Sequence, residues 1–356
     1  MTADWTSPID VGTMQLPHRL AMAPMTRSRA KPDGTPGDLA TAYYAQRATM
    51  GLLISEGTQP SDDGQGYLAT PGIYTDAHVA GWRRVTDAVH AAGGRLFVQL
   101  MHVGRISHPE NTPHHRQPVA PSAIAPGVDM FTMRGMQPIP EPRELTTAEV
   151  RQTVADFAQA AACAVEAGAD GVEVHGANGY LVHQFLAPDS NRRTDAYGGS
   201  MENRARFAIE VVRAIADAIG PERTAIRLSP GVPAGGIAEG QDNDDLYRHL
   251  AAEFDGMGLA YVHVLHVRSD PLLADLRKVF KGVMIVNRPG RPREKIGSDV
   301  AAGLADMESL GVMALANPDL VKRLETDAPL NEVRQALFYA GGGAEGYTDY
   351  PALETA

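Results

Sequence analysis

The chain has 356 residues, with 32 Lys and Arg against 43 Asp and Glu, so its formal net charge is −11. No Lys- or Arg-rich stripe interrupts this acidic balance, which argues against nucleic acid and anionic membranes as partners. No apolar run reaches the ~18 residues of a membrane span, and the opening residues, MTADWTSPID, do not read as a signal peptide. Cys163 is the only cysteine and is expected to be a small core residue, so a cytoplasmic protein without disulfides is expected.

Short β-type runs alternate with longer helical patterns along the chain. The expected strands cover residues 19–23, 52–56, 95–100, 171–175, 225–228, 261–264, 283–286 and 308–310. The expected helices cover residues 39–49, 76–92, 146–167, 201–218, 242–253, 272–280, 299–305 and 318–324. Eight strands, each followed by a helix, predict an α/β fold of the (β/α)8 TIM barrel type, with residues 1–356 as a single domain. A doubly wound sheet is the alternative, but no Gly-x-Gly-x-x-Gly motif joins a first strand to a helix.

Local signals mark some helix ends. Thr146 and Glu149 have the spacing of a capping box at the third helix. Gly93-Gly94 and Gly168 are expected to stop the helices that precede them.

Two segments lie outside the alternation of strands and helices. Residues 8–17, PIDVGTMQLP, are expected to form a hairpin that closes the barrel floor. Residues 101–145 form a Pro- and His-rich excursion after the third strand, and a loop of that length is expected to be functional. We interpret it as a lid, in which His114 and His115 belong to a solvated loop and not to a metal site.

Polar residues gather where the expected strands end, which is where a barrel of this type carries its chemistry. His175 ends the fourth strand, and Asn178 and Tyr180 follow within six residues. Two of these side chains can bind a substrate oxygen and the third can give up a proton. On residue types alone, the His–x–x–Asn pair could equally cap a turn and Tyr180 could be a core aromatic. No metal site is expected, because no second His or carboxylate stands at metal-ligand spacing beside His175.

Five segments of the chain, in order, resemble the Old Yellow Enzyme family of FMN-dependent ene-reductases. They are LAMAPMTRSRA, ISEGTQPSDDGQGY, FVQLMHVGRISHP, HGANGYLVHQFLAPDSNRRTDAYGGSMENRARF and GGGAEGYTDYP. The resemblance runs from about residue 8 to residue 351. It implies a TIM barrel that holds FMN at its mouth and is reduced by NAD(P)H.

The resemblance also implies which residues would contact the flavin. Pro24 and Thr26 would line the isoalloxazine ring, and the backbone at Gly57 would approach it. Gln99 would bond the pyrimidine edge of the ring. Arg227 would lie near N1, where a fixed guanidinium stabilises the negative charge that develops on reduction.

The same resemblance implies the roles of the substrate residues. His175 and Asn178 would bond the carbonyl or nitro oxygen of an activated alkene, hydride would pass from the flavin to the β-carbon, and Tyr180 would protonate the α-carbon. A phenol suits that role, because its ordinary pKa of ~10 keeps the proton on at pH 7. Tyr67 and Tyr350 would line the pocket wall. Met101 stands where the family commonly has Trp, which predicts a roomier pocket.

The sequence departs from the family where the flavin phosphate should bind. The turn after the seventh strand reads Asn-Arg-Pro-Gly-Arg-Pro over residues 287–292, so Gly290 keeps one glycine but two prolines lack an N–H. After the eighth strand, Gly311 is followed by Val312 where the family has an arginine. Losing one charge-assisted hydrogen bond costs ~1.5–3 kcal/mol, which weakens binding by roughly ten- to a hundred-fold or more.

Two enzymatic functions therefore stay open at this point, and a non-catalytic small-molecule binding protein is a third class, which the intact Tyr180 disfavours. The first is an FMN-dependent ene-reductase that acts on a small-molecule activated alkene, with one of the arginines of residues 288–293 replacing the missing charge or with weakened FMN binding. The second is a flavin-free barrel that uses the His/Asn/Tyr set for a redox-neutral isomerisation or cyclisation. Either protein is expected to be a monomer or a homodimer.

Overall fold

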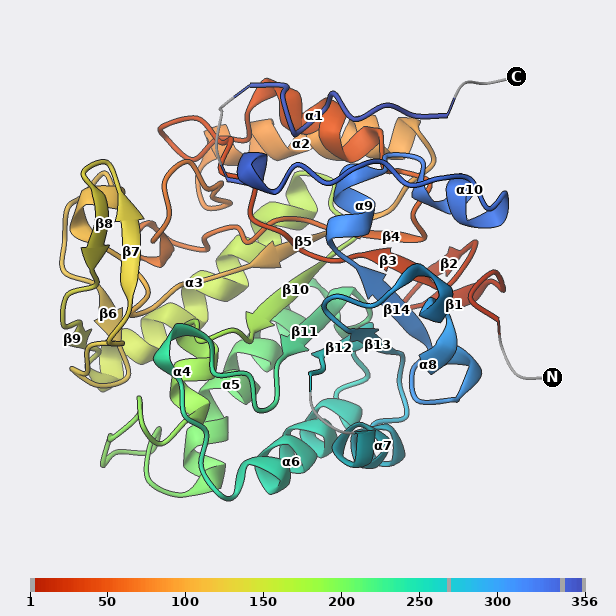
Figure 1. Cartoon of the computed structure of the whole chain (residues 1–356). Helices are drawn as coiled ribbons and strands as arrows, with labels where there is room; N and C mark the ends of the chain where they lie inside the picture. Colours follow the sequence, from red (N-terminus) through yellow and green to blue (C-terminus); the bar gives the residue numbers. More distant parts are fainter. Residues whose placement is uncertain (1–3, 268–269, 340–342, 354–356) are drawn as a thin grey trace.

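The computed structural model describes residues 4–267, 270–339 and 343–353 (Figure 1). Its centre is a closed barrel of eight parallel strands in the order β10-β11-β12-β13-β14-β3-β4-β5. The strands are β3 Leu20–Met22, β4 Leu52–Ile54, β5 Leu96–Leu100, β10 Gly171–Gly176, β11 Thr224–Leu228, β12 Tyr261–Leu265, β13 Met284–Asn287 and β14 Met307–Leu310. The TIM barrel is confirmed, and each of the eight strands lies where the sequence predicts it.

Helices surround the barrel. Those that the sequence predicts are α1 Asp38–Ala45, α2 Asp76–Ala91, α3 Thr147–Glu166, α5 Met201–Ile219, α6 Asn243–Asp255, α7 Asp270–Val279, α8 Ser298–Ala301 and α10 Leu320–Glu325. The capping box of Thr146 and Glu149 is present. The short helices α4 Leu181–Leu186 and α9 Val312–Ala316 were not predicted, because fewer than two turns show no helical period. Among the described residues, no helix has the length and apolarity to cross a membrane.

A hairpin of β1 Ile9–Val11 and β2 Met14–Leu16 covers the amino-terminal end of the barrel. Its Val11 and Leu16 are fully buried and pack against inward-facing residues of the barrel strands, among them Phe97 and Ile285. These contacts make the lower half of the barrel interior apolar.

The inward-facing positions become polar toward the carboxyl ends of the strands. Because side chains alternate along a strand, Phe97 and Gln99 both point inward, and so do Ala225 and Arg227. The outward residues between them, such as Val98, pack under the helices. A buried polar layer therefore lies above the apolar one and forms the base of the barrel mouth.

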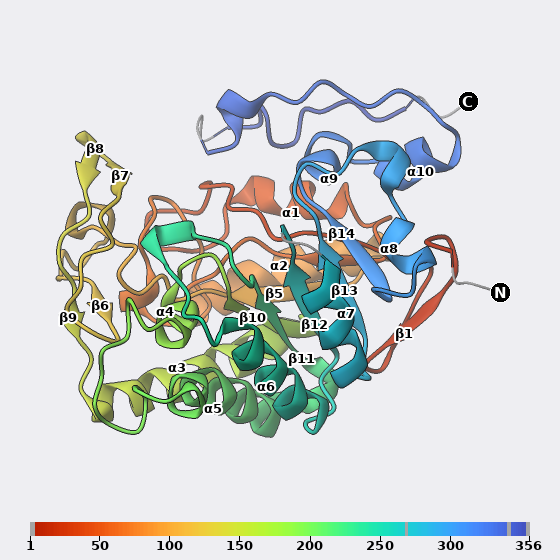
Figure 2. The same cartoon turned by 60° about the horizontal axis from the view of Figure 1, so that its bottom comes forward.

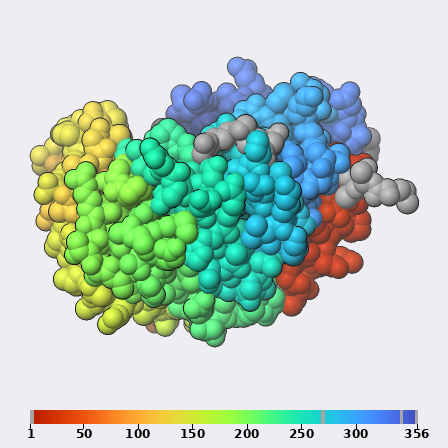
Figure 3. All heavy atoms as spheres, turned by 90° about the horizontal axis from the view of Figure 1, so that it is seen from below, coloured from red at the N-terminus to blue at the C-terminus, as the bar shows by residue number. Residues whose placement is uncertain are grey.

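The excursion after β5 contains two small pairs of strands. β6 Val119–Ala120 pairs with β9 Arg143–Glu144, and β7 Asp129–Thr132 pairs with β8 Gly135–Pro138 as an antiparallel hairpin. In Figures 1 and 3 these yellow residues form a lobe at one edge of the molecule, opposite the red amino-terminal hairpin.

The segment after α10 returns across the face of the molecule on which the β7–β8 hairpin rises (Figure 2). Two buried arginines hold it there by its backbone carbonyls. Arg29 donates to the carbonyls of Leu337 and Glu345, each at 3.1 Å, and Arg27 donates to that of Gly346 at 2.8 Å. The carboxyl-terminal part of the chain is therefore fixed beside the barrel mouth.

Candidate active site

The segment that leaves β10 brings the predicted His, Asn and Tyr residues into one turn. Asn178 and Gly179 both have positive φ angles, 56° and 81°, so the chain reverses direction before α4 begins. A side chain at Gly179 would collide with the carbonyl of Ala234, which makes glycine necessary there. The reversal places the ring of Tyr180 edge-on to that of His175, with centroids 4.8 Å apart.

His175 is held as a neutral hydrogen-bond donor. Its Nδ1 accepts the backbone N–H of Ala177 at 3.3 Å, so the ring hydrogen lies on Nε2. Burial, and then the charge of Arg227, hold the pKa of His175 well below its ordinary value. A neutral Nε2–H at a barrel mouth can donate to a substrate oxygen.

Tyr180 is held in its protonated form. Its hydroxyl lies 3.0 Å from that of Tyr67, and the two rings meet edge to face. Burial, and then the neighbouring Tyr67, raise the pKa of Tyr180 well above its ordinary value. Tyr180 can therefore give a proton only to a strongly basic atom, such as a carbanion.

A buried hydrogen-bond chain lies in the polar layer beneath these residues. Gln99 donates its Nε2 to Glu173 at 2.7 Å, and His263 bridges Glu173 and Ser309 with two contacts of 2.8 Å. Burial alone would raise the pKa of Glu173, but His263 and Arg227 outweigh it and hold that pKa below its ordinary value. Because the ionised Glu173 takes the amide N–H of Gln99, the carbonyl oxygen of Gln99 remains as an acceptor for another group.

The loop after β3 forms another side of the mouth. Pro24 and Thr26 are half-buried there. Gly57 lies against Met101, since a Cβ at Gly57 would collide with the thioether of Met101. The side chain of Met101, which is smaller than the Trp that is common in the family, thus lies against Gly57.

A cavity of about 620 Å³ opens beside Tyr180. It is lined by Thr26, Ser28, Tyr67, Leu68, Ala69, Ile106, Val128, Asp129, Met130, Phe131, Met136, Ile139, Tyr180, Gly235 and Tyr339. The β7–β8 hairpin therefore supplies one wall, as expected of a lid. Met101 is buried in the apolar cluster beside this cavity.

Tyr350, predicted to line the pocket, lies outside this cavity. It packs against Leu315 and Ala316, and its hydroxyl accepts the backbone N–H of Arg334 at 3.1 Å. Tyr339, which the sequence did not single out, stands in the cavity wall instead.

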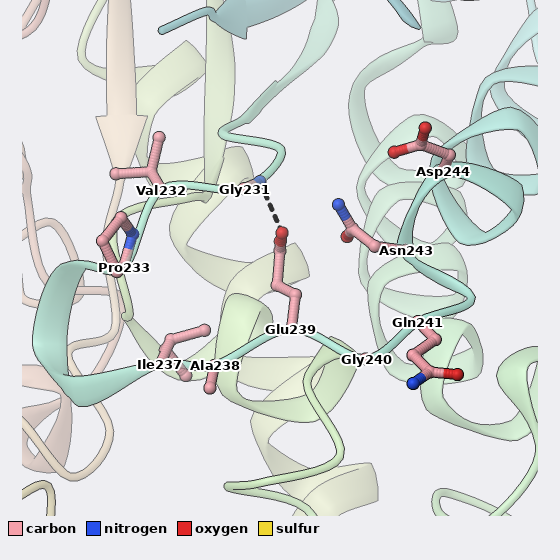
Figure 4. A pocket seen from close by; sticks show the side chains of 10 residues that line it. All are labelled: Gly231, Val232, Pro233, Ile237, Ala238, Glu239, Gly240, Gln241, Asn243 and Asp244. Carbon is pink, nitrogen blue, oxygen red and sulfur yellow. Dashed lines mark hydrogen bonds between the residues drawn. The ribbon is translucent and has the colours of Figure 1, made fainter. Parts of the chain in front are cut away.

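Glu239 is a further residue that the sequence reading missed. The fully buried His183 accepts the backbone N–H of Gly179 on Nδ1 at 3.0 Å and faces Glu239 through Nε2 at 2.8 Å. Tyr247 donates its hydroxyl to the same carboxylate at 2.5 Å, and Gly231 donates its backbone N–H. Figure 4 shows Glu239 pointing back at Gly231 across a second hollow of about 410 Å³.

This carboxylate connects the turn of residues 175–180 to the loop between β11 and α6. The backbone N–H of Asn178 adds a second tie, because it donates to Ser229 Oγ at 2.9 Å. No local sequence pattern predicts the role of Glu239, because its partner His183 lies 56 residues earlier in the chain.

Comparisons with known proteins show the family to which the chain belongs. A profile of the NADH:flavin oxidoreductase / NADH oxidase family matches residues 6–331. The chain belongs to the Old Yellow Enzyme family of flavin oxidoreductases. It is 41% identical to 12-oxophytodienoate reductase 2 of Arabidopsis thaliana, over 98% of this chain and 96% of the relative.

Solved structures of the family have the same fold. Morphinone reductase in complex with tetrahydroNAD superposes with a TM-score of 0.95 at 45% identity, over 99% of this chain and 98% of that one. The Old Yellow Enzyme homologue from Zymomonas mobilis gives a TM-score of 0.94 at 36% identity, over 99% of this chain and all (100%) of that one. This chain is therefore a flavin-dependent oxidoreductase.

Two side chains of the buried polar layer, Arg227 and Gln99, fit a flavin ring. Arg227 is buried, and its Nη2–H donates to Asn287 Oδ1 at 3.0 Å. Its Nε–H has no hydrogen-bond partner among the described residues. A buried donor without a partner is costly unless a bound group satisfies it. An electron-rich flavin edge is such a group, and the spare carbonyl oxygen of Gln99 is a matching acceptor.

The arginines of the phosphate segment are already engaged. Arg288 forms a bidentate pair with Asp299, with contacts of 2.8 and 2.9 Å. Arg291 pairs with both Asp299 and Glu308, two buried carboxylates. Arg293 donates to two backbone carbonyls of the segment around α10. Moving Arg291 toward a phosphate would take the ion pair from the buried Glu308, and an unpaired buried carboxylate is costly. Arg288 would still compensate Asp299.

Gly290 and Gly311 are the glycines of the phosphate segment, but the residue after Gly311 brings no positive charge. Gly290 is exposed with a φ of 75°, and Gly311 is the N-cap of α9. Val312 follows as the first residue of α9 and is 44% exposed. The position at which the family has an arginine therefore presents an apolar side chain to solvent.

Proposed function

We propose that this protein is an ene-reductase that uses FMN and NAD(P)H to reduce the activated C=C bond of α,β-unsaturated carbonyl or nitro compounds. The observation that carries the proposal is the grouping of neutral His175, Asn178 and protonated Tyr180 at the barrel mouth, beside a cavity. Similarity to 12-oxophytodienoate reductase, and to morphinone reductase solved with tetrahydroNAD, supports a small-molecule alkene and a nicotinamide reductant.

Each side chain has a role that follows from its surroundings. His175 Nε2–H and the amide of Asn178 donate to the carbonyl or nitro oxygen and draw electron density from the double bond. The electron-poor β-carbon then accepts hydride, which is the chemistry that FMN supplies when bound. Tyr180 protonates the α-carbon, and its raised pKa keeps the proton in place until the carbanion forms.

Three side chains would hold the flavin ring. The unpartnered Nε of Arg227 would donate to it, and the carbonyl oxygen of Gln99 would accept from it. Thr26 would contact the carbonyl edge of the ring. Glu173 keeps the amide of Gln99 in the orientation that this contact requires.

A redox-neutral isomerase or cyclase is the second candidate, and the phosphate segment favours it. Arg291 is tied to two buried carboxylates, and Val312 replaces the expected cation. A barrel that holds flavin weakly could still use the same His, Asn and Tyr side chains to polarise a carbonyl and move a proton.

The test begins with the visible spectrum of purified protein before and after incubation with FMN and desalting. A retained band near ~450 nm, followed by anaerobic conversion of 2-cyclohexenone to cyclohexanone with NADPH or NADH, supports the ene-reductase. Protein that retains no FMN and reduces no enone in excess FMN contradicts it, and isomerisation of the enone would then support the second candidate.

A further inference from the structure

The buried polar layer of the barrel is one continuous chain of hydrogen bonds. Glu173 accepts from Gln99 and from His263, and His263 also contacts Ser309 Oγ. Asn287 completes the chain, because its Nδ2 donates to the carbonyl of Ser309 at 2.8 Å and its Oδ1 accepts from the arginine of β11. The chain thus links six neighbouring strands and consists of Gln99, Glu173, Arg227, His263, Asn287 and Ser309, all of them buried.

This polar layer holds one negative and one positive side chain. Glu173 is fully buried and ionised, and Arg227 is 4% exposed. Burial lowers the pKa of Arg227, but the carboxylate of Glu173 opposes that effect and favours the charged guanidinium. Burial also lowers the pKa of His263, so its ring is neutral at pH 7 and adds no charge. The two charges of the polar layer therefore cancel.

Glu173 lies close to both side chains that fit a flavin ring. It takes the amide N–H of Gln99 at 2.7 Å, and it shares the polar layer with Arg227. It also precedes His175 by two residues on β10, so both side chains face the barrel interior. A charge at Glu173 acts on the barrel mouth through a buried interior, which screens it much less than water does.

Such a charge matters for a flavin because reduction leaves a negative charge on the ring. NAD(P)H delivers two electrons and one proton together as hydride, so no positive charge accompanies the second electron. Arg227 alone would stabilise the reduced form strongly. A carboxylate beside it opposes that stabilisation, because like charges repel. The balance of the two decides how readily hydride is passed on to an alkene.

We propose that Glu173 sets the reduction potential of the bound flavin, because its fixed carboxylate offsets the charge of Arg227 and keeps the reduced form from being over-stabilised. This inference rests on the proposed function, because it concerns the flavin that the ene-reductase uses. Glu173 touches neither the flavin nor the alkene in this role. It acts through its charge, and its contact with Gln99 holds that charge in place.

The test compares the dissociation constants of oxidised FMN and of dithionite-reduced FMN, both measured by anaerobic ultrafiltration. Their ratio gives the shift in potential on binding, with 29.6 mV for each factor of ten in a two-electron couple. In the wild-type protein the two constants should agree within about tenfold, because the charges of the polar layer cancel. Reduced FMN that binds a hundredfold or more tightly would show that Arg227 is not offset, and it would overturn the proposal.

Glu173→Gln removes the charge but keeps the size of the side chain and an acceptor for His263. It should favour reduced over oxidised FMN by roughly ten- to twentyfold, the effect of one unit charge over about 10 Å in a protein interior. That factor raises the potential by about 30–40 mV. Reduction by NAD(P)H should become faster and oxidation by 2-cyclohexenone slower, an opposition that a general loss of structure does not produce.

Ser309→Ala is the matched control. It removes a hydrogen bond to His263 from the same chain without changing any charge, so the ratio of the two dissociation constants should stay as in the wild-type protein. An unchanged ratio in Glu173→Gln, or an equal shift in Ser309→Ala, would overturn the proposal.

A further pair of variants separates the charge of Glu173 from its hold on Gln99. Gln99→Leu removes the amide, and adding Glu173→Gln to it should still favour reduced FMN by the same factor. A shift that disappears in the double variant would mean that Glu173 acts only through the orientation of Gln99, which contradicts the role of its charge.

These measurements need no alkene, so they are independent of the proposed function. A shifted ratio in a protein that reduces no enone would overturn the proposed function alone. An unmoved ratio in a protein that reduces enones would overturn the role of Glu173 alone. A protein that binds neither form of FMN would overturn both.

Discussion

The hydroxyl of Tyr67 lies 3.0 Å from the hydroxyl of Tyr180, and this contact is the only hydrogen bond that the described residues offer to the side chain of the proposed acid. Tyr67 itself is partly buried, and its removal from water raises its pKa as well. Both phenols are therefore protonated at neutral pH. Tyr67 can orient the Tyr180 hydroxyl without drawing off its proton.

Tyr180→Phe should lower the turnover of 2-cyclohexenone by 10²- to 10⁴-fold, the usual contribution of a positioned acid. The phenylalanine keeps the ring contact with His175, so alkene binding and the flavin absorbance should stay unchanged. Stopped-flow oxidation of the reduced protein by the enone measures the loss directly.

Tyr67→Phe is the matched control, since it removes one hydroxyl from the same pair. It should cost less than tenfold, because a phenylalanine at 67 leaves the Tyr180 proton in place. An equal loss in the two variants would show that Tyr67 is the proton donor or that the pair acts as one unit.

Glu239→Ala should loosen the turn that carries Asn178. It removes the acceptor of three donors, on the buried His183 and Tyr247 and on the half-buried Gly231, and each buried group left unsatisfied costs about 1–3 kcal/mol. Thermal denaturation should show a large loss of stability. Glu239→Gln keeps an acceptor for His183 and Tyr247 and should fold better.

Glu239→Gln is therefore the variant in which enzyme kinetics should be measured. Its KM for the enone should rise more than its kcat falls, while FMN retention stays constant, because only the position of Asn178 is disturbed. Gln241→Ala, on the exposed side of the same loop, should alter neither constant. A fall in kcat alone would contradict a positioning role.

The barrel could be predicted from the sequence because its strands are short, buried and apolar, and most of them are followed by a helix that is long enough to show a helical period. His175, Asn178 and Tyr180 could be found because they follow one strand end within six residues. The prediction of the barrel and the prediction of these three residues both needed only residues that lie close together in the sequence.

Contacts between distant segments could not be predicted in this way. Tyr339 reaches the cavity wall because Arg29 fixes a carbonyl 308 residues away. Tyr350 was assigned to that wall from its motif, but side-chain packing turns it toward α9. The polar partners Glu173 and His263 did leave a signal, a charged residue and a histidine inside otherwise apolar strands, which indicates a buried network.

Stability should depend on pH through Glu56. This carboxyl is buried and accepts the backbone N–H of Arg27 at 3.0 Å, and burial raises its pKa to about 7. Between its unfolded and folded pKa values the folded protein binds more protons, so this stabilisation is complete below about pH 4.5 and is lost as pH rises through about 7. The loss amounts to roughly 3 kcal/mol at pH 8.

Glu56→Gln keeps an acceptor for Arg27 but cannot ionise. Urea unfolding at pH 5, 6, 7 and 8 should show the wild-type protein losing stability relative to Glu56→Gln as the pH rises. Two parallel curves would mean that Glu56 ionises at its ordinary pKa and that Arg27 and Arg29 compensate its burial.

Val312→Arg should strengthen FMN binding by roughly ten- to a hundred-fold, since it restores one charge-assisted hydrogen bond to the phosphate. Val312 is the exposed first residue of α9, so an arginine fits there without disturbing the core. Quenching of FMN fluorescence on titration with protein gives the dissociation constant. Riboflavin, which lacks the phosphate, is the matched ligand and should bind both proteins equally. If FMN affinity does not change, another group already holds the phosphate, and the network of Arg288, Arg291 and Asp299 would be the next to mutate.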